Sequence, residues 1–152
     1  MYLHRICSQN FRAFGDGTTA PSLDWELNKG MNILIGENDA GKTAIIDAIR
    51  HMLWTTSFEV VRLLEQDFHV VGSNRAETLV IEATLCDLSP EQEAAVLEWL
   101  TYEKDGSRSL VLNLQARRQP PQAKRRARVD TITRSGRNGS PLRGSGARKR
   151  RG

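Results

Sequence analysis

The fold is decided by the stretch Met31-Asn-Ile-Leu-Ile-Gly-Glu-Asn-Asp-Ala-Gly-Lys-Thr-Ala-Ile-Ile-Asp-Ala-Ile-Arg50. Its first five residues form a short, mostly apolar run of strand length. Behind the glycine-bounded loop, apolar side chains recur at helical spacing, at Ile45, Ile46, Ala48, Ile49, Met52 and Leu53. The sequence therefore predicts a strand, a loop and a helix in one uninterrupted run.

The loop at residues 36–43 matches the pattern G-x-x-x-x-G-K-[ST] without a substitution. Gly36 and Gly41 permit a turn tight enough for successive backbone N–H groups to face phosphate oxygens. The start of the following helix adds free N–H groups and the positive end of its dipole. We expect the Lys42 ammonium to contact the β- and γ-phosphates and the Thr43 hydroxyl to be a ligand of Mg²⁺.

The predicted ligands are therefore ATP and Mg²⁺. The alternative is a strand-to-helix turn that happens to contain glycine and an exposed lysine. The predicted binding residues of the loop are Gly36, Glu37, Asn38, Asp39, Ala40, Gly41, Lys42, Thr43 and Ala44.

Charge is distributed unevenly along the 152 residues, a length typical of one domain. Residues 1–116 hold 9 Lys/Arg and 17 Asp/Glu, a net charge of −8, whereas residues 117–152 hold 13 and 1, a net charge of +12. The two sum to the +4 of the whole chain, so the pI near 9.4 reflects the C-terminal segment. Cys7 and Cys86 form no disulfide framework or metal cluster, and no apolar run approaches the ~20 residues of a membrane span. These features predict a cytoplasmic protein without a membrane partner.

Two strands are predicted ahead of the loop. Residues 2–11 form the first, and Gly15-Asp16-Gly17 makes a turn after it. Residues 22–27 form the second, in which Leu23, Trp25 and Leu27 alternate with acidic side chains. Asn28-Lys29-Gly30 is predicted to close a hairpin into residues 31–35.

A strand that ends in Asn10-Phe11-Arg12, a hairpin, and then Ile35-Gly-Glu-Asn-Asp-Ala-Gly-Lys-Thr43 followed by Ile46-Asp-Ala-Ile49 resembles the N-terminus of the SMC/RecF group of ABC-type ATPases. Within that group the chain is most similar to the OLD-family (overcoming lysogenization defect) ATP-dependent endonucleases. The resemblance covers residues 1–138 and rests mainly on the first 53. It implies an α/β fold, the N-terminal part of a P-loop NTPase with β-rich hairpins and an incomplete sheet.

The resemblance also assigns roles to residues around the loop. It implies that Arg12 lies beside the nucleotide phosphates, although an ordinary surface arginine at a strand end remains an alternative. Asp39 stands where many relatives have glycine, so we expect it to act only as a loop-shaping N–H donor. Gln66 is a candidate for the glutamine that senses the γ-phosphate through Mg²⁺ and water, and a solvated helix end is the alternative.

Later segments predict further elements. We expect a helical piece at residues 54–69, a strand at 77–87, a strand at 109–116 and its partner at 126–134. Ser89, Pro90 and Gln92 form the start of a short helix that continues to Leu100, with Trp99 in the core. Three histidines, His4, His51 and His69, lack ligand spacing and are interpreted as structural or exposed.

Several parts of a working ABC-type ATPase are missing from this sequence. Asp87 is rejected as the carboxylate that orders Mg²⁺, because Glu82 interrupts the apolar run before it and Leu88 follows it. The signature loop and the acidic metal ligands of the OLD nuclease domain are also missing. We therefore expect residues 1–138 to be the N-terminal part of an ATPase domain and 139–152 a basic, disordered tail. A frameshift or premature stop after about Asn138 would explain the abrupt basic ending.

Three functions remain open. The first is ATP binding as the ATPase part of an OLD-like endonuclease that acts on DNA and forms homo-oligomers when full-length, with the nuclease domain absent from this chain. The second is a stand-alone P-loop enzyme of the kinase type. The third is a nucleic-acid-binding module in which the basic tail contacts phosphates without sequence preference.

Overall fold

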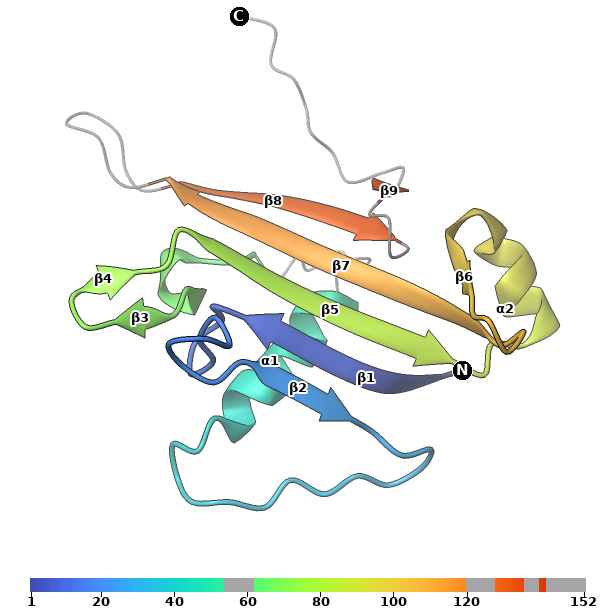
Figure 1. Ribbon diagram of the computed structural model, residues 1–152, viewed down its shortest axis with the longest axis horizontal. Coiled ribbons are helices and arrows are strands. Elements are labelled where there is room, and N and C mark those ends of the chain that lie inside the picture. The colour runs from blue at the N-terminus through green and yellow to red at the C-terminus, as the bar shows by residue number, and fades with distance from the viewer. Residues whose placement is uncertain (54–61, 120–127, 136–139, 142–152) are drawn as a thin grey trace, which may run out of the picture.

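An antiparallel sheet of seven strands dominates the computed structural model, which describes residues 1–53, 62–119, 128–135 and 140–141. The strand order is β2-β1-β5-β7-β8-β9, and β6 pairs with one end of β7. The strands are β1 (Tyr2–Gln9), β2 (Leu23–Glu26), β5 (Thr78–Cys86), β6 (Leu100–Tyr102), β7 (Arg108–Gln119), β8 (Arg128–Ser135) and β9 (Ser140–Pro141). The two long strands β5 and β7 lie side by side in the middle of the sheet (Figure 1).

The longest helix of the described residues, α1 (Lys42–Leu53), lies across one face of this sheet (Figure 1). Ala44, Ala48 and Met52, which recur at helical spacing, are buried against the apolar side chains of the strands. The strands supply Ile6, Leu23, Leu79, Ile81, Ala83, Leu114 and Ala116 to the same core. The core therefore fixes the start of α1, and the loop that precedes it, relative to the sheet.

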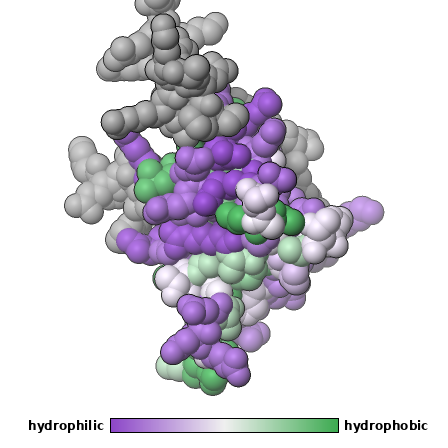
Figure 2. Space-filling model, turned by 90° about the vertical axis from the view of Figure 1, so that its left-hand side faces the viewer, coloured by the Kyte–Doolittle hydropathy of each residue, from purple (hydrophilic) through white to green (hydrophobic). Residues whose placement is uncertain are grey.

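Short elements surround the two ends of the sheet. They are the 3-10 turn η1 (Glu65–Asp67), the hairpin of β3 (Val70–Val71) and β4 (Asn74–Arg75), the helix α2 (Pro90–Ala95) and the 3-10 turn η2 (Leu97–Trp99). The end that carries the β3–β4 hairpin is mostly hydrophilic, with small, separated hydrophobic patches (Figure 2). No helix in the described part of the chain is long and apolar enough to cross a membrane.

The α/β fold with a partial sheet is confirmed, and most of the predicted strands are present. In β5, the side chains of Leu79, Ile81, Ala83 and Leu85 are buried while those between them are not, as period-2 alternation requires. The predicted partner strands near residues 109–116 and 126–134 pair as β7 and β8. At α2, the Ser89 hydroxyl accepts from Gln92 N at 3.3 Å, and Gln92 Oε1 accepts from Ser89 N at 2.9 Å. The capping box is thus confirmed.

The predicted hairpin between residues 22–27 and 31–35 is wrong. The second strand, β2, pairs with β1, and residues 31–35 adopt no regular secondary structure. Met31, Ile33 and Ile35 are 85%, 70% and 90% exposed. The physical reason is that an extended segment needs a neighbouring strand to satisfy its N–H and C=O groups, and none of the described residues supplies one.

The expectations for two helices also need correction. Within the predicted helix 54–69, residues 54–61 lie outside the described residues, and the rest forms only the single turn η1. The second helix ends at Ala95 and does not reach Leu100. Leu100 instead begins β6 and pairs with Leu110 across the Asp105–Gly106 turn. In the predicted tail, Ser140 and Pro141 pair with β8 as β9, and residues 142–152 lie outside the description.

Candidate phosphate site

The loop of residues 36–41 leads directly into α1 and is closed by the side chain of Lys42. Its Nζ donates to the carbonyl oxygen of Gly36 at 2.7 Å and also to that of Glu37. Two loop residues have positive φ, Asp39 at 66° and Gly41 at 85°. Aspartate and asparagine tolerate this left-handed conformation better than most residues, which explains how Asp39 fits at this position.

Most main-chain amides of this loop have no acceptor among the residues that the structure describes. Between Glu37 and Thr43, the described chain contains one internal N–H bond, from Ala40 N to Glu37 O at 3.3 Å. The amides at the start of α1 have no carbonyl one turn earlier to accept from them, as at any helix N-terminus. The loop therefore presents a group of N–H donors that an anion can occupy.

A depression of about 380 Å³ lies over these donors. Arg12, from the turn after β1, contributes to it together with the loop and the start of α1. The lining residues are Arg12, Ala13, Asn38, Asp39, Gly41, Lys42, Thr43 and Ala44. The structure thus brings Arg12 beside a loop that lies more than twenty residues later in the sequence.

Arg12 is held in place by a dense set of contacts. Its guanidinium donates to Asp67 through Nε at 2.9 Å and to Asp47 through Nη1, and it lies 5.4 Å from the centre of the Phe11 ring. Its main-chain N–H donates to Asp67 O at 2.8 Å, and its carbonyl oxygen lies 2.7 Å from His69 Nδ1. The turn after β1 is therefore joined to residues 67–69, and the arginine is positioned from both sides.

Sequence reasoning missed the two carboxylates that hold Arg12. Asp47 lies one helical turn after Thr43, and this i,i+4 spacing on α1 was a signal that could have identified it. Asp67 lies in η1, next to Gln66, the residue predicted to sense the γ-phosphate. Gln66 is exposed and does not line the depression. Asp87, rejected from the sequence, pairs with Lys29 at 2.6 Å and does not line it either.

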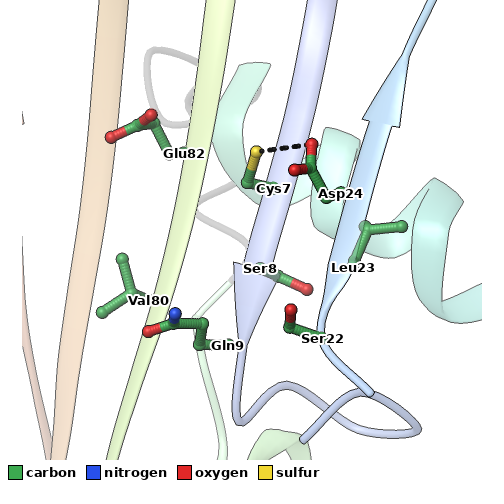
Figure 3. Close-up of a pocket in the computed structure, with 8 residues that line it drawn as sticks. All are labelled: Cys7, Ser8, Gln9, Ser22, Leu23, Asp24, Val80 and Glu82. Carbon is green, nitrogen blue, oxygen red and sulfur yellow. Dashed lines mark hydrogen bonds between the residues drawn. The ribbon is translucent and has the colours of Figure 1, made fainter. Parts of the chain in front are cut away.

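A second hollow, of about 310 Å³, lies on the sheet face opposite α1 (Figure 3). Here the Cys7 thiol donates to Asp24 Oδ1 at 3.4 Å, and Asp24 also accepts two bonds from Arg5, at 2.7 and 2.6 Å. Burial, followed by the bond to Asp24, raises the pKa of Cys7 to about 11, while Arg5 lowers the pKa of Asp24. The thiol is therefore protonated at neutral pH, which makes it a poor nucleophile.

Comparison with known proteins agrees with the geometry of the loop. Residues 1–134 match the AAA ATPase domain family. The DNA replication and repair protein RecF of Glaesserella parasuis serovar 5 is 30% identical over 83 residues, which are 51% of this chain and 21% of that protein. RecF of Streptococcus suis is 39% identical over 57 residues, which are 38% of this chain and 14% of RecF. The chain thus spans about a fifth or less of these relatives.

The fold also matches a solved structure from work on ATP-driven dimerization and DNA-stimulated activation of SMC ATPases. The TM-score is 0.55 at 16% identity, and the match covers 93% of this chain and 72% of the other. A family match over residues 1–134 includes the loop, α1 and nearly all of the sheet. The chain therefore belongs to the AAA ATPase domain family, with the fold of a P-loop NTPase of the SMC/RecF kind.

Proposed function

We propose that this chain binds ATP together with Mg²⁺ at the depression over residues 36–44. The observation that carries the proposal is the convergence of open main-chain amides, one lysine, one threonine and one arginine on a single depression. All of these groups are N–H or O–H donors, and such a donor set suits a polyphosphate.

Each group has a distinct role in this proposal. The amides between Glu37 and Thr43 surround the phosphate oxygens, and the Lys42 ammonium moves from the loop carbonyls to the β- and γ-phosphates. The Thr43 hydroxyl, which is exposed at the first turn of α1, is the protein ligand for Mg²⁺. Mg²⁺ neutralises phosphate charge. Gln66 is a weaker candidate for the metal, because η1 places it outside the depression.

We further propose that the chain acts as the N-terminal ATPase part of an OLD-like ATP-dependent endonuclease that acts on DNA as a homo-oligomer. Three points support this role. The order of strand end, loop and helix resembles that family; RecF is a DNA replication and repair protein; and the SMC ATPases with this fold undergo ATP-driven dimerization. In this proposal the described residues supply phosphate-binding groups, and DNA cleavage is the task of a nuclease domain.

Calorimetric titration of the full 152-residue chain with Mg·ATP tests the nucleotide site. We expect one binding event that EDTA weakens and that Lys42→Ala abolishes, because the ammonium supplies charge-assisted bonds that no other loop side chain replaces. Lys104→Ala, in the turn between β6 and β7, is the matched control and should bind normally. A folded wild-type chain that ignores Mg·ATP would refute the proposal.

A further inference from the structure

The guanidinium of Arg12 lies between two carboxylates at the edge of the proposed phosphate site. Nε donates to Asp67 Oδ1 at 2.9 Å, and Nη1 donates to Asp47 Oδ2. The Arg12 side chain is 32% exposed, whereas those of Asp47 and Asp67 are 14% and 3% exposed. Carboxylate and phosphate oxygens compete for the same guanidinium N–H groups, so these acids determine how freely Arg12 can turn to a phosphate.

The two carboxylates differ in what else holds them. Asp67 is almost fully buried and is fixed in η1, where Oδ2 accepts from Leu64 N at 2.8 Å and its main-chain oxygen accepts from Arg12 N. Among the described residues, Arg12 is the cation that pairs with Asp67. Because an uncompensated buried carboxylate is costly, the bond from Asp67 to Arg12 Nε is expensive to break.

Asp47, in contrast, has a second cation. Its Oδ1 accepts from Arg50 Nη1 at 3.2 Å, one turn further along α1. If Arg12 leaves Asp47, that carboxylate keeps Arg50 as a partner and remains close to solvent. The cost of exchanging the Asp47 bond is therefore smaller than the cost of exchanging the Asp67 bond.

We propose that Asp47 competes with the ATP phosphates for the guanidinium of Arg12, and that Asp67 is the fixed residue that positions Arg12. On binding, Arg12 exchanges its Nη1 bond to Asp47 for one to a phosphate oxygen, while Nε stays on Asp67. Asp47 then pairs with Arg50 alone. This inference rests on the proposed function of the loop, and it adds that α1 carries a carboxylate that restrains nucleotide binding.

The two acids consequently have opposite effects on affinity. Asp47→Asn removes the competing charge and should tighten Mg·ATP binding about 10-fold, the scale of one hydrogen bond to a charged group. Asp67→Asn leaves Arg12 without its anchor and should weaken binding by a similar factor. Asp39→Asn removes a negative charge that lines the same depression without contacting Arg12, and it measures the effect of charge alone.

A double-mutant cycle separates a contact through Arg12 from an effect through space. Mg·ATP is titrated into the 152-residue wild-type chain, Asp47→Asn, Arg12→Ala and the double variant, with circular dichroism to confirm folding. We expect Arg12→Ala to weaken binding and Asp47→Asn to have no further effect in the Arg12→Ala background. Asp47 is partly exposed on a helix, so this cycle remains informative even if Asp67→Asn fails to fold.

Three results would overturn the inference. Asp47→Asn could leave affinity unchanged or lower it; it could tighten binding equally without Arg12; or Asp39→Asn could tighten binding as much as Asp47→Asn. Each of these leaves the proposed nucleotide site intact, because the wild type still binds Mg·ATP and Lys42→Ala still does not. A wild-type chain that binds no Mg·ATP would overturn both proposals together.

Discussion

The side-chain ammonium of Lys42 lies against the main chain of Gly36, with Nζ donating to the Gly36 carbonyl oxygen at 2.7 Å. The lysine thereby ties the beginning of the loop to the beginning of α1, across six residues. Its bonds to neutral carbonyls are weaker than bonds to phosphate oxygens would be, because charge on both partners strengthens a hydrogen bond. A polyphosphate can therefore displace the Lys42 ammonium from the loop carbonyls.

Removing the Lys42 side chain should loosen the loop before any ligand is added. In Lys42→Ala, we expect faster amide hydrogen exchange at Ala40, whose N–H donates to the Glu37 carbonyl, because the two bonds from Lys42 that hold this part of the loop are lost. Mg·ATP should slow exchange there in the wild type and not in the variant. Lys104→Ala should behave as the wild type in both conditions, and identical exchange in all three proteins would contradict the expectation.

The hydroxyl of Thr43 should account for the metal dependence of binding. Thr43→Ser keeps the oxygen and should keep the affinity for Mg·ATP, whereas Thr43→Val keeps the shape and should lose about 10-fold or more, as loss of a metal contact does. In EDTA, all three proteins should bind ATP equally weakly. If valine lowered affinity as much without Mg²⁺, the side chain would act by packing rather than as a ligand.

Gly41 combines a positive φ of 85° with a crowded position. A Cβ added there would lie 3.3 Å from Phe14 Cζ and 3.5 Å from Ala13 Cβ. Gly41→Ala should therefore destabilise the fold by about 1–2 kcal/mol, the cost of the left-handed conformation for other residues. It should also weaken ATP binding, because the strained loop shifts the amides that the phosphates require.

Gly106→Ala provides the matched control for Gly41. Its φ of 83° carries the same backbone cost, but nothing lies within 4 Å of the added Cβ, and the residue is far along the chain in the β6–β7 turn. Urea unfolding should show a similar loss of stability in both variants, with normal Mg·ATP titration for Gly106→Ala only. Equal affinities for the two variants would show that the loop tolerates the change.

The local patterns that predicted correctly are those whose partners lie nearby in the sequence. The Ser89 capping box involves residues three apart, and the alternation in β5 depends only on which face of one strand is buried. The loop of residues 36–43 likewise carries its donors within eight residues. The capping box and the alternation were predictable because the interacting groups belong to one segment, whereas the phosphate-binding role of residues 36–43 stays a prediction.

The features that were not predicted correctly depend on partners that are distant in the sequence. Residues 31–35 have the composition of a strand, but strand formation requires a neighbour, and β2 pairs with β1 instead. The acids that hold Arg12 could not be paired with it from sequence, since Asp47 and Asp67 lie 35 and 55 residues away. Of the two, only Asp47 carried a local signal, through its spacing from Thr43 on one face of α1.

The last prediction concerns the thiol of Cys7 in the hollow on the opposite face of the sheet (Figure 3). Burial and the bond to Asp24 raise its pKa from about 9 to about 11, so at pH 8 the thiolate is about 100-fold scarcer than in the unfolded chain. Because the thiolate is the reactive species, iodoacetamide should modify Cys7 correspondingly slowly in the folded protein. Peptide mass spectrometry separates Cys7 from Cys86, whose pKa is also raised by burial.

Asp24→Asn distinguishes a raised pKa from simple steric protection. The substitution removes the carboxylate that favours the protonated thiol and leaves Arg5, whose charge lowers the pKa of Cys7. The midpoint of the pH–rate profile of Cys7 should therefore move from about pH 11 to a lower pH. Glu26→Gln, on the same strand, removes a charge that acts on Arg5 and not directly on Cys7, and it should move the profile much less than Asp24→Asn. Folding raises the pKa of Cys7, so the protonated thiol stabilises the folded state. This contribution to the free energy of unfolding is complete below about pH 9 and is lost as the pH rises through 11. A Cys7 profile that stayed in place in Asp24→Asn would assign its slow reaction to access alone.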